Sequence, residues 1–272
     1  MSYQLFICSI PIGNLDDITL SVTSCLKKVT VIFCEDTRMA KQFLFDHSIW
    51  NNQRLIRMDQ YKEKESFELF DSLIKECDIA FITDAGSPAI SDPGALLVNH
   101  ARITNVSVKV LGGISALTTF LSGAGVLSND FYFGGFFPKK EGDIAKALDL
   151  IIKSKLVGVW FESPKRILRA LLNVSKLYPA IKVVAAKELT KSYELFLRGS
   201  VLDVCNQLSK LDTRGEWVFL LDARLIKLDY NQAYMSLAAN LKAIGLTSKQ
   251  VKQLAPLFDL NKNDLYDKFQ QL

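Results

Sequence analysis

Residues 1–125 alternate between short apolar runs and longer stretches in which apolar residues recur at helical spacing. The runs are rich in β-branched and aromatic residues and predict buried strands at 5–10, 29–34, 55–58, 79–82 and 107–111. Helices are predicted from near Thr19, after Arg38, at about 65–76, near 95–101 and at 116–121. Strands that alternate with helices favour an α/β fold with a mostly parallel, doubly wound sheet.

The stretch 79–94 combines a predicted buried strand with a polar loop. The strand leads into Asp84, Gly86, Ser87 and Pro88, followed by the turn Asp92-Pro93-Gly94. Ligands of open parallel sheets bind outside the carboxyl ends of the strands, so this loop is a candidate ligand site. Taken alone, the same residues equally describe a strand followed by two β-turns with no ligand.

A second set of elements follows a polar, glycine-containing break at 122–130, where we predict a domain boundary. Strands are predicted at 131–137, 156–161, 183–186, 193–198 and 217–221, and helices at 144–152 and 201–208. Another helix is predicted to begin with Ser163 as N-cap and Pro164 at its first position. The predicted organisation is one α/β domain at 1–121, a second at 131–226 and a tail at 227–272.

The tail loses the strand pattern from about Asn231 and predicts small helices. We expect its apolar residues to pack into a compact unit. These residues are Leu241, Ile244, Leu246, Val251, Leu254, Leu257, Phe258, Leu265 and Phe269.

Composition narrows the class of protein. The chain has 272 residues, of which 49% are hydrophobic and 23% charged, as in ordinary soluble proteins. No apolar run approaches a membrane span, and no basic region precedes the first apolar segment, so we expect a cytoplasmic protein without a signal peptide. Five cysteines without C-x-x-C spacing and only two histidines predict reduced thiols and no metal site. No G-x-G-x-x-G follows a predicted strand, which argues against a dinucleotide cofactor.

Basic residues are concentrated between Lys139 and Arg169. This segment has eight basic and four acidic residues, an excess as large as the formal charge of +4 of the entire chain. Such a face is what binding to a phosphate backbone requires. Two amphipathic helices with solvated outer faces explain the same charges equally well.

Several motifs, in the same order along the chain, resemble those of one family. They begin with Ser9-Ile10-Pro11-Ile12-Gly13-Asn14-Leu15, which is similar to TPIGNL, and Glu35-Asp36-Thr37-Arg38, which is similar to EDTR. Asp84-Ala85-Gly86-Ser87-Pro88 with Asp92-Pro93-Gly94 is similar to DAGTP and DPG. The later motifs are Gly135-Phe136-Phe137-Pro138 (GF-x-P), Phe161-Glu162-Ser163-Pro164 with Arg166 (YESPHR), and Glu188-Leu189-Thr190-Lys191 (RELTK). Together they resemble the ribosomal RNA small subunit methyltransferase I family of the tetrapyrrole methylase superfamily.

This resemblance implies two α/β domains with S-adenosylmethionine in the cleft between them, and no metal. It also implies methyl transfer to the ribose 2′-hydroxyl of a cytidine in the decoding region of 16S rRNA in the small ribosomal subunit. A homodimer is usual in the superfamily. Carried over by motif, the cofactor contacts are Pro11, Asp84, Ser87, Ile90, Ser115, Ala116, Phe161, Leu189 and Val218.

Methylation of a ribose hydroxyl depends on positioning and benefits from a base that accepts the proton. Candidates for the catalytic group are Glu35, Arg38, Glu162 and Glu188, near predicted strand ends. Candidates for RNA contacts are Arg38, Lys139, Lys140, Lys165, Arg166 and Arg169. For each carboxylate, a helix cap or an ion pair is the alternative role, and for Asp36 we favour the cap.

The chain departs from the family pattern at two places where the family has histidines. Asp59-Gln60-Tyr61-Lys62 replaces the segment H-E-H-N, and Lys165 replaces the histidine of YESPHR. A catalytic role for those histidines is therefore excluded in this chain. The missing histidines motivate one alternative to an rRNA methyltransferase, a ribosome-binding relative without activity. A small-molecule, precorrin-type tetrapyrrole methyltransferase is a second alternative, but such a substrate explains neither the basic segment nor the helical tail.

Overall fold

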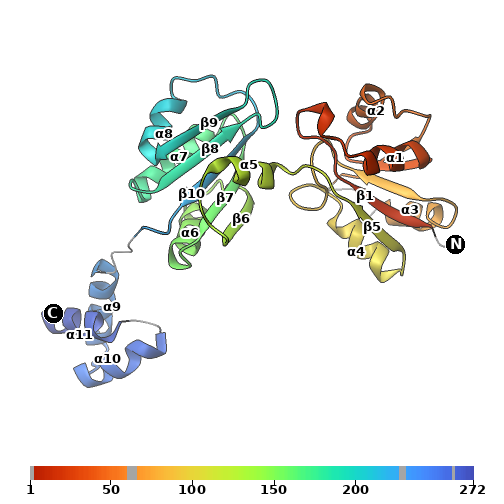
Figure 1. Ribbon diagram of the computed structural model, residues 1–272. Coiled ribbons are helices and arrows are strands. Elements are labelled where there is room, and N and C mark those ends of the chain that lie inside the picture. The colour runs from red at the N-terminus through yellow and green to blue at the C-terminus, as the bar shows by residue number, and fades with distance from the viewer. Residues whose placement is uncertain (1–2, 60–65, 227–230, 259–260) are drawn as a thin grey trace. The chain divides into compact units, whose positions relative to one another are not determined.

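The computed structural model describes residues 3–59, 66–226, 231–258 and 261–272 (Figure 1). The chain forms two compact units, Met1–Leu225 and Ile226–Leu272. The first unit contains two five-stranded sheets, and the second contains helices. Among the described residues, no helix is both long and apolar enough to cross a membrane.

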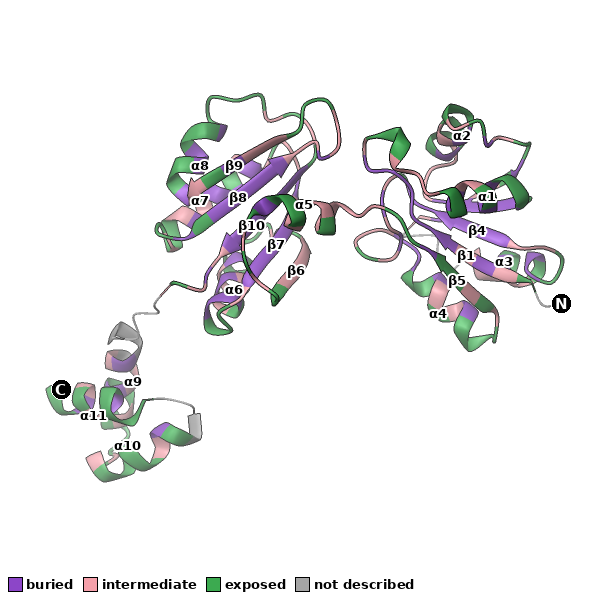
Figure 2. Cartoon of the chain, in the orientation of Figure 1, coloured by how far each residue is buried: buried purple, intermediate pink, exposed green. Residues whose placement is uncertain are grey.

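The first sheet has the order β3-β2-β4-β1-β5 and is parallel throughout, as predicted. Its strands are β1 (Gln4–Cys8), β2 (Val31–Cys34), β3 (Arg54–Arg57), β4 (Ile79–Ile82) and β5 (Ser107–Leu111). Strands β2 and β4 are buried along their whole length, which explains their uninterrupted apolar sequence. Figure 2 shows the buried strand β4. The strand predicted over 5–10 ends earlier, at Cys8, and Ile10 instead forms an isolated bridge with Gly86.

Helices cover both faces of this sheet, as a doubly wound fold requires. One face packs against α1 (Leu20–Lys28) and α2 (Thr37–Asp46), through residues such as Leu26 and Leu44. The other packs against α3 (Phe67–Leu73) and α4 (Ala95–Ile103), through residues such as Phe70 and Leu97. Helix α3 is shorter than predicted, because the chain turns after Leu73.

The second sheet has the order β6-β7-β10-β8-β9, and only its β6–β7 pair is parallel. Its strands are β6 (Phe131–Phe136), β7 (Val157–Glu162), β8 (Lys182–Lys187), β9 (Leu195–Ser200) and β10 (Trp217–Asp222). The accompanying helices are α6 (Glu141–Lys153), α7 (Ile167–Leu177) and α8 (Val201–Leu208).

Two features of this half differ from the expectation. Ser163 is not the N-cap of α7. Its carbonyl accepts from Arg166 N and Ile167 N in a turn that precedes the helix, and α7 begins at Ile167 with Arg166 at the N-cap position. Helix α5 (Ala116–Ala124) packs on the second sheet, with Phe120 and Ala124 in the same core cluster as residues of β7, β8 and β10. An apolar helix between two sheets carries no sequence signal of which one it will cover.

The second unit consists of α9 (Asn231–Ala243), α10 (Ser248–Leu254), the 3-10 helix η3 (Ala255–Phe258) and α11 (Lys262–Gln271), so the predicted helical tail is confirmed. Val251, Leu265 and Phe269 are buried in its core, and Leu241 and Leu246 pack against it. Ile244 was expected there but is 73% exposed, because α9 ends just before it. The side chains of Leu257 and Phe258 lie outside the described residues.

Candidate functional site

Three loops of the first sheet are fastened together at the carboxyl ends of its strands. Ile10 and Gly86 exchange backbone hydrogen bonds of 2.9 and 3.1 Å, which joins the loops after β1 and β4. The hydroxyls of Ser9 and Ser87 are 3.0 Å apart, and Ser87 Oγ donates to the Ile114 carbonyl at 3.4 Å. These contacts hold Ser87 at the junction of the three loops, where the topology of a parallel sheet predicts a ligand site.

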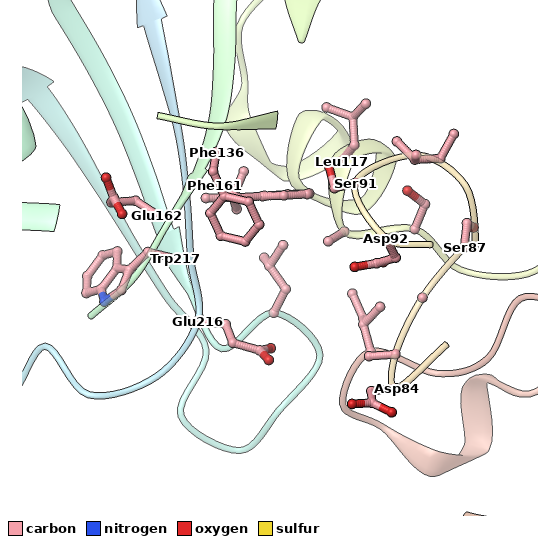
Figure 3. A pocket seen from close by; sticks show the side chains of 18 of the residues that line it. Asp84, Ser87, Ser91, Asp92, Leu117, Phe136, Phe161, Glu162, Glu216 and Trp217 are labelled. Carbon is pink, nitrogen blue, oxygen red and sulfur yellow. The ribbon is translucent and has the colours of Figure 1, made fainter. Parts of the chain in front are cut away.

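A cavity of about 450 Å³ lies against these loops, within the size range of small-molecule sites. Its lining comes from the loop after β4, with Asp84, Ser87 and Asp92, and from the second sheet, with Phe136, Phe161, Glu162 and Trp217; Leu117 of α5 also contributes (Figure 3). Of the predicted cofactor contacts, all but Pro11 line the cavity. These are Asp84, Ser87, Ile90, Ser115, Ala116, Phe161, Leu189 and Val218.

Apolar side chains make up the deeper part of the lining. Ile12, Leu189 and Val218 are at most 9% exposed and belong to one core cluster. Leu117 and Phe161 pack against the same cluster. Such a surface is suited to the flat, weakly polar ring of a ligand.

The polar part of the lining is acidic. Glu35, Asp84, Asp92, Glu162 and Glu216 contribute to it, and the described lining includes no Lys, Arg or His. Burial, followed by the charge of Asp84, raises the pKa of Glu35; burial also raises the pKa of Asp84 and of Asp92. A cavity of this charge favours a cationic ligand and disfavours a phosphate.

Glu35 and Arg38 lie close in sequence but face different surroundings. Glu35 lines the cavity, and its carboxylate accepts a long hydrogen bond, 3.4 Å, from the backbone N–H of Asp84. Arg38 is not part of the lining; its side chain is 88% exposed and pairs with Asp36 at 2.8 Å. Asp36 also caps α2 by accepting from Arg38 N, so the predicted cap is confirmed and Arg38 pairs with the cap rather than with Glu35.

Glu162 is the most constrained carboxylate of the lining. Its side chain is fully buried, its Oε1 accepts from Ser163 N at 2.7 Å, and its Oε2 lies 3.0 Å from Arg166 Nη2. Arg166 also donates to the carbonyls of Phe137 and Pro138. Figure 3 shows the carboxylate directed away from Asp84 and Ser87. Glu162 and Arg166 thus connect the end of β7 to the segment after β6.

Glu188 does not line the cavity. Its carboxylate accepts from Glu216 N at 2.9 Å and from Lys191 Nζ at 3.1 Å, and Lys191 also pairs with the Glu216 carboxylate at 3.0 Å. This network supports the loop that carries Glu216. A neighbouring residue, Thr190, accepts from Asn14 N at 3.1 Å and so ties this loop to the loop after β1.

The remaining predicted RNA contacts are exposed and close in sequence to the second side of the cavity. Lys139 and Lys140 come a few residues after Phe136, and Lys165 comes directly after Pro164; Phe136 and Pro164 both line the cavity. Arg169 lies on the first turn of α7. Lys146 and Lys153, further along α6, instead form ion pairs of 3.4 Å with Asp143 and Asp149.

The lining includes residues that sequence reasoning did not select, among them Asp92, Phe136, Glu216 and Trp217. Asp92 and Phe136 belong to the DPG and GF-x-P motifs, so a signal was present for them. Trp217 is the first residue of β10 and Glu216 directly precedes it, and neither belongs to a motif. The segment that replaces H-E-H-N extends beyond Asp59 into residues outside the described ranges, whereas Lys165, the other replacement, is exposed. No group of three or more His, Cys, Asp or Glu within the described ranges is arranged to hold a metal ion.

The family model for Tetrapyrrole (Corrin/Porphyrin) Methylases matches residues 4–204. The chain belongs to this methylase family. Two relatives carry the name Ribosomal RNA small subunit methyltransferase I. The one from Helicobacter pylori is 33% identical, and the alignment covers 99% of this chain and 97% of the relative. The one from Hydrogenobaculum is 38% identical, and the alignment covers 80% of this chain and 95% of the relative. At this identity and coverage, the chain falls within that branch of the tetrapyrrole methylases.

Solved structures of other tetrapyrrole methylase-like proteins share the fold. Diphthine synthase aligns with a TM-score of 0.65 at 12% identity, over 81% of this chain and 90% of that one. The cobalt precorrin-4 methyltransferase of cobalamin biosynthesis aligns with a TM-score of 0.59 at 16% identity, over 82% and 96%. These likenesses support the paired α/β architecture of residues 1–225.

Proposed function

We propose that this protein uses S-adenosylmethionine to methylate the ribose 2′-hydroxyl of a cytidine in the decoding region of 16S rRNA. The names of the relatives support small-subunit rRNA as the substrate. The observation that carries the proposal is the cavity itself. Its lining combines carboxylates with apolar side chains, and exposed basic residues lie close in sequence to one side of it.

The lining fits S-adenosylmethionine in charge and polarity. This cofactor has a cationic sulfonium, an ammonium group and an adenine ring, but no phosphate. The carboxylates of Glu35, Asp84 and Asp92 suit the cationic groups, and the surface of Ile12, Leu189 and Val218 suits the ring. When bound, the cofactor supplies an electrophilic methyl group.

Among the candidate carboxylates, Glu35 is the best placed to accept the proton of the ribose hydroxyl. Among the described residues, it lines the cavity and accepts one long hydrogen bond, whereas Glu162 is buried and ion-paired with Arg166 and Glu188 lies outside the lining. Burial and the charge of Asp84 raise the pKa of Glu35, which makes it a stronger base than a solvated glutamate. We therefore assign proton acceptance to Glu35 and positioning of the lining to Glu162, Arg166 and Glu188.

Exposed cations beside the second side of the cavity would bind RNA phosphates. Lys139, Lys140, Lys165 and Arg169 are exposed and in positions suited to this role. Arg38 is also exposed, but its pairing with Asp36 would have to be shared with a phosphate. We further propose a homodimer, as is usual in the superfamily, which light scattering of the purified protein would test.

The test of the proposed function is methyl transfer from tritiated S-adenosylmethionine to small ribosomal subunits that lack the modification. Large subunits and a precorrin-type tetrapyrrole serve as alternative acceptors. We expect label in the small subunit alone. Label in the tetrapyrrole would establish the small-molecule alternative, and binding to small subunits without transfer would establish a relative that has lost activity.

The cofactor site has its own test by calorimetry in the presence of a chelator. We expect S-adenosylmethionine to bind without a metal ion, and Ser87→Trp to abolish binding because the indole would fill the junction of the three loops. A matched substitution at an exposed serine of the same unit, Ser209→Trp, should leave the affinity unchanged. A strict requirement for a divalent ion, or normal binding by Ser87→Trp, would contradict the proposed site.

A further inference from the structure

Two consecutive phenylalanines at the end of β6 have opposite environments. Phe137 is 1% exposed, and its ring packs against Trp160 and Phe219 at centroid distances of 5.4 and 5.1 Å. Phe136 lines the cavity and is nevertheless 62% exposed. An aromatic side chain exposed at the edge of a cavity is available to contact a ligand there.

The backbone before Phe136 is specialised to produce this exposure. The register between β6 and β7 shifts between Phe133 and Phe136, at Gly134 and Gly135. Gly135 has φ +64°, and a Cβ on Gly134 would collide with the indole of Trp160, so both positions strongly favour glycine. Irregularities of this kind re-aim side chains at the ends of strands, and this one presents Phe136 at the cavity.

The segment that carries Phe136 is also held firmly. Arg166 donates to the carbonyls of Phe137 and Pro138, directly after it, and is itself paired with the buried Glu162. The ring of Phe136 meets that of Phe161 edge-on, with centroids 6.0 Å apart and an interplanar angle of 68°. A ring fixed in this way loses little conformational freedom when a flat partner stacks on it.

The charge around this ring favours RNA as the partner. Lys139 and Lys140 follow Phe136 in the chain and are exposed. The exposed Lys165 lies next to Arg166, which donates to the carbonyl of Pro138 in the segment after Phe136. Glu141 and Asp143, in the first turn of α6, offset part of that charge, and Asp143 is itself paired with Lys146. Aromatic rings beside cations are the arrangement that binds single-stranded nucleic acid, by stacking bases while the phosphates are neutralised.

We propose that Phe136 is a stacking platform for an unpaired nucleobase of the RNA substrate, at or next to the nucleotide that is methylated. This inference rests on the proposed function and adds to it a requirement that the substrate be single-stranded at the site. The adenine of the cofactor is the competing occupant. The buried apolar lining of Ile12, Leu189 and Val218 offers it a more enclosed surface than the exposed ring does.

The experiment uses the full chain and a fluorescein-labelled, single-stranded oligoribonucleotide with the sequence of the decoding region. Phe136→Ala should raise the Kd roughly 5- to 100-fold, the range expected for loss of one base stack. Phe136→Trp should restore binding, whereas Phe136→Leu, apolar but without a π face, should not. Phe131→Ala is the matched control, because Phe131 is also exposed on β6 but does not line the cavity.

Three further readouts identify the partner. The slope of log Kd against log salt should be unchanged in Phe136→Ala, because no cation is removed. Binding of a fully paired RNA duplex should not depend on Phe136, and the affinity for S-adenosylmethionine should change less than twofold. Weaker cofactor binding with normal RNA binding would assign Phe136 to adenine, and full restoration by Phe136→Leu would show an apolar contact without stacking; either result overturns the inference.

The proposed function is judged separately, by methyl transfer from the wild-type protein to small subunits. Wild-type protein that transfers methyl groups while Phe136→Ala binds RNA normally would refute the platform alone. Stacking-dependent RNA binding without transfer would support the platform and refute the proposed reaction. Melting temperatures of all variants, expected within a few degrees of wild type because the ring is exposed, exclude unfolding as the cause.

Discussion

The two sides of the cavity are built by sheets of different topology and offer different chemistry. The parallel first sheet contributes loops from the carboxyl ends of β2, β4 and β5, with the carboxylates of Glu35, Asp84 and Asp92. The mostly antiparallel second sheet contributes the aromatic residues Phe136 and Phe161, and exposed cations follow in the same loops. We infer that the carboxylates of the first side bind the cationic groups of the cofactor, that the buried apolar residues of the second side, such as Leu189 and Val218, hold its ring, and that the exposed flank of the second side binds RNA.

The largest effect is expected from Glu35→Gln, which keeps the shape of the side chain but removes the carboxylate that accepts the proton. Single-turnover methyl transfer should fall about 10²-fold or more, the usual size for loss of acid–base assistance, with cofactor affinity changed only a few-fold. In the wild type, the rate should rise with pH through the raised pKa of Glu35, and in the variant this rise should disappear.

Asp36→Asn is the matched control for Glu35→Gln, since it alters the next residue, which caps α2 and pairs with Arg38. It should change the melting temperature modestly and leave the pH–rate profile intact. A normally stable and fully active Glu35→Gln protein would remove Glu35 from the mechanism.

Arg166→Ala tests whether the second side depends on its internal ion pair. Removing the guanidinium leaves the buried Glu162 carboxylate without its partner and frees the carbonyls of Phe137 and Pro138. Because the arginine is partly exposed, we expect a loss in unfolding free energy of up to about 3 kcal/mol, measured by urea denaturation. Lys165→Ala, one residue earlier and exposed, should change it by less than about 0.5 kcal/mol. Equal stability of the two variants would contradict the structural role of Arg166.

The exposed cations should account for the salt dependence of RNA binding. Replacing Lys139, Lys140, Lys165 and Arg169 singly by Gln should lower the slope of log Kd against log salt by about one for each phosphate that the variant no longer neutralises. Lys146→Gln and Lys153→Gln are controls on α6, which follows Lys139 and Lys140, because each of these lysines already pairs with an aspartate. An unaltered slope in all four variants would make this flank a solvated surface.

A smaller effect is expected from Asp92→Asn on the acidic side. Its carboxylate lines the cavity, so cofactor affinity should fall several-fold by calorimetry. Burial raises the pKa of Asp92, so the folded state holds its proton more tightly than the unfolded state does. Ionised Asp92 therefore lowers stability as pH rises through that pKa.

Asp92→Asn should accordingly raise the melting temperature at neutral pH, and the gain should shrink as the pH is lowered. Glu68→Gln, which removes an exposed carboxylate from α3, should leave both the cofactor affinity and this pH dependence unchanged. If Asp92→Asn bound the cofactor normally, the charge of this side would not contribute to recognition.

The sequence was most informative about the parallel sheet. The buried strands β2 and β4 are apolar without interruption, and their polar loops must meet at one edge of the sheet, so Asp84 and Ser87 could be placed together in advance. The antiparallel pairing of β10 with β7 and β8 left no comparable signal. Because β10 and β7 are antiparallel, Glu216 and Trp217, at the start of β10, lie beside the end of β7 and line the same cavity.

Local rules were also outweighed by nearby contacts. Ser163-Pro164 has the sequence of a helix start, but the Ser163 carbonyl accepts from Arg166 N and Ile167 N in a turn, and α7 begins only at Ile167. The motif residue Glu188 follows a strand, as a site residue would, but it supports the loop of Glu216 from behind the lining. Sequence alone does not distinguish a carboxylate that lines a cavity from one that supports the lining through hydrogen bonds to its backbone.

The most direct test of the account is the position of the transferred methyl group. Small subunits labelled with tritiated S-adenosylmethionine are digested with alkali, which cleaves only next to a free 2′-hydroxyl. We predict that the label is recovered in an alkali-resistant dinucleotide whose 5′ nucleoside is 2′-O-methylcytidine. Label recovered in a mononucleotide would place the methyl group on a base and contradict the assignment of a ribose hydroxyl to the cavity.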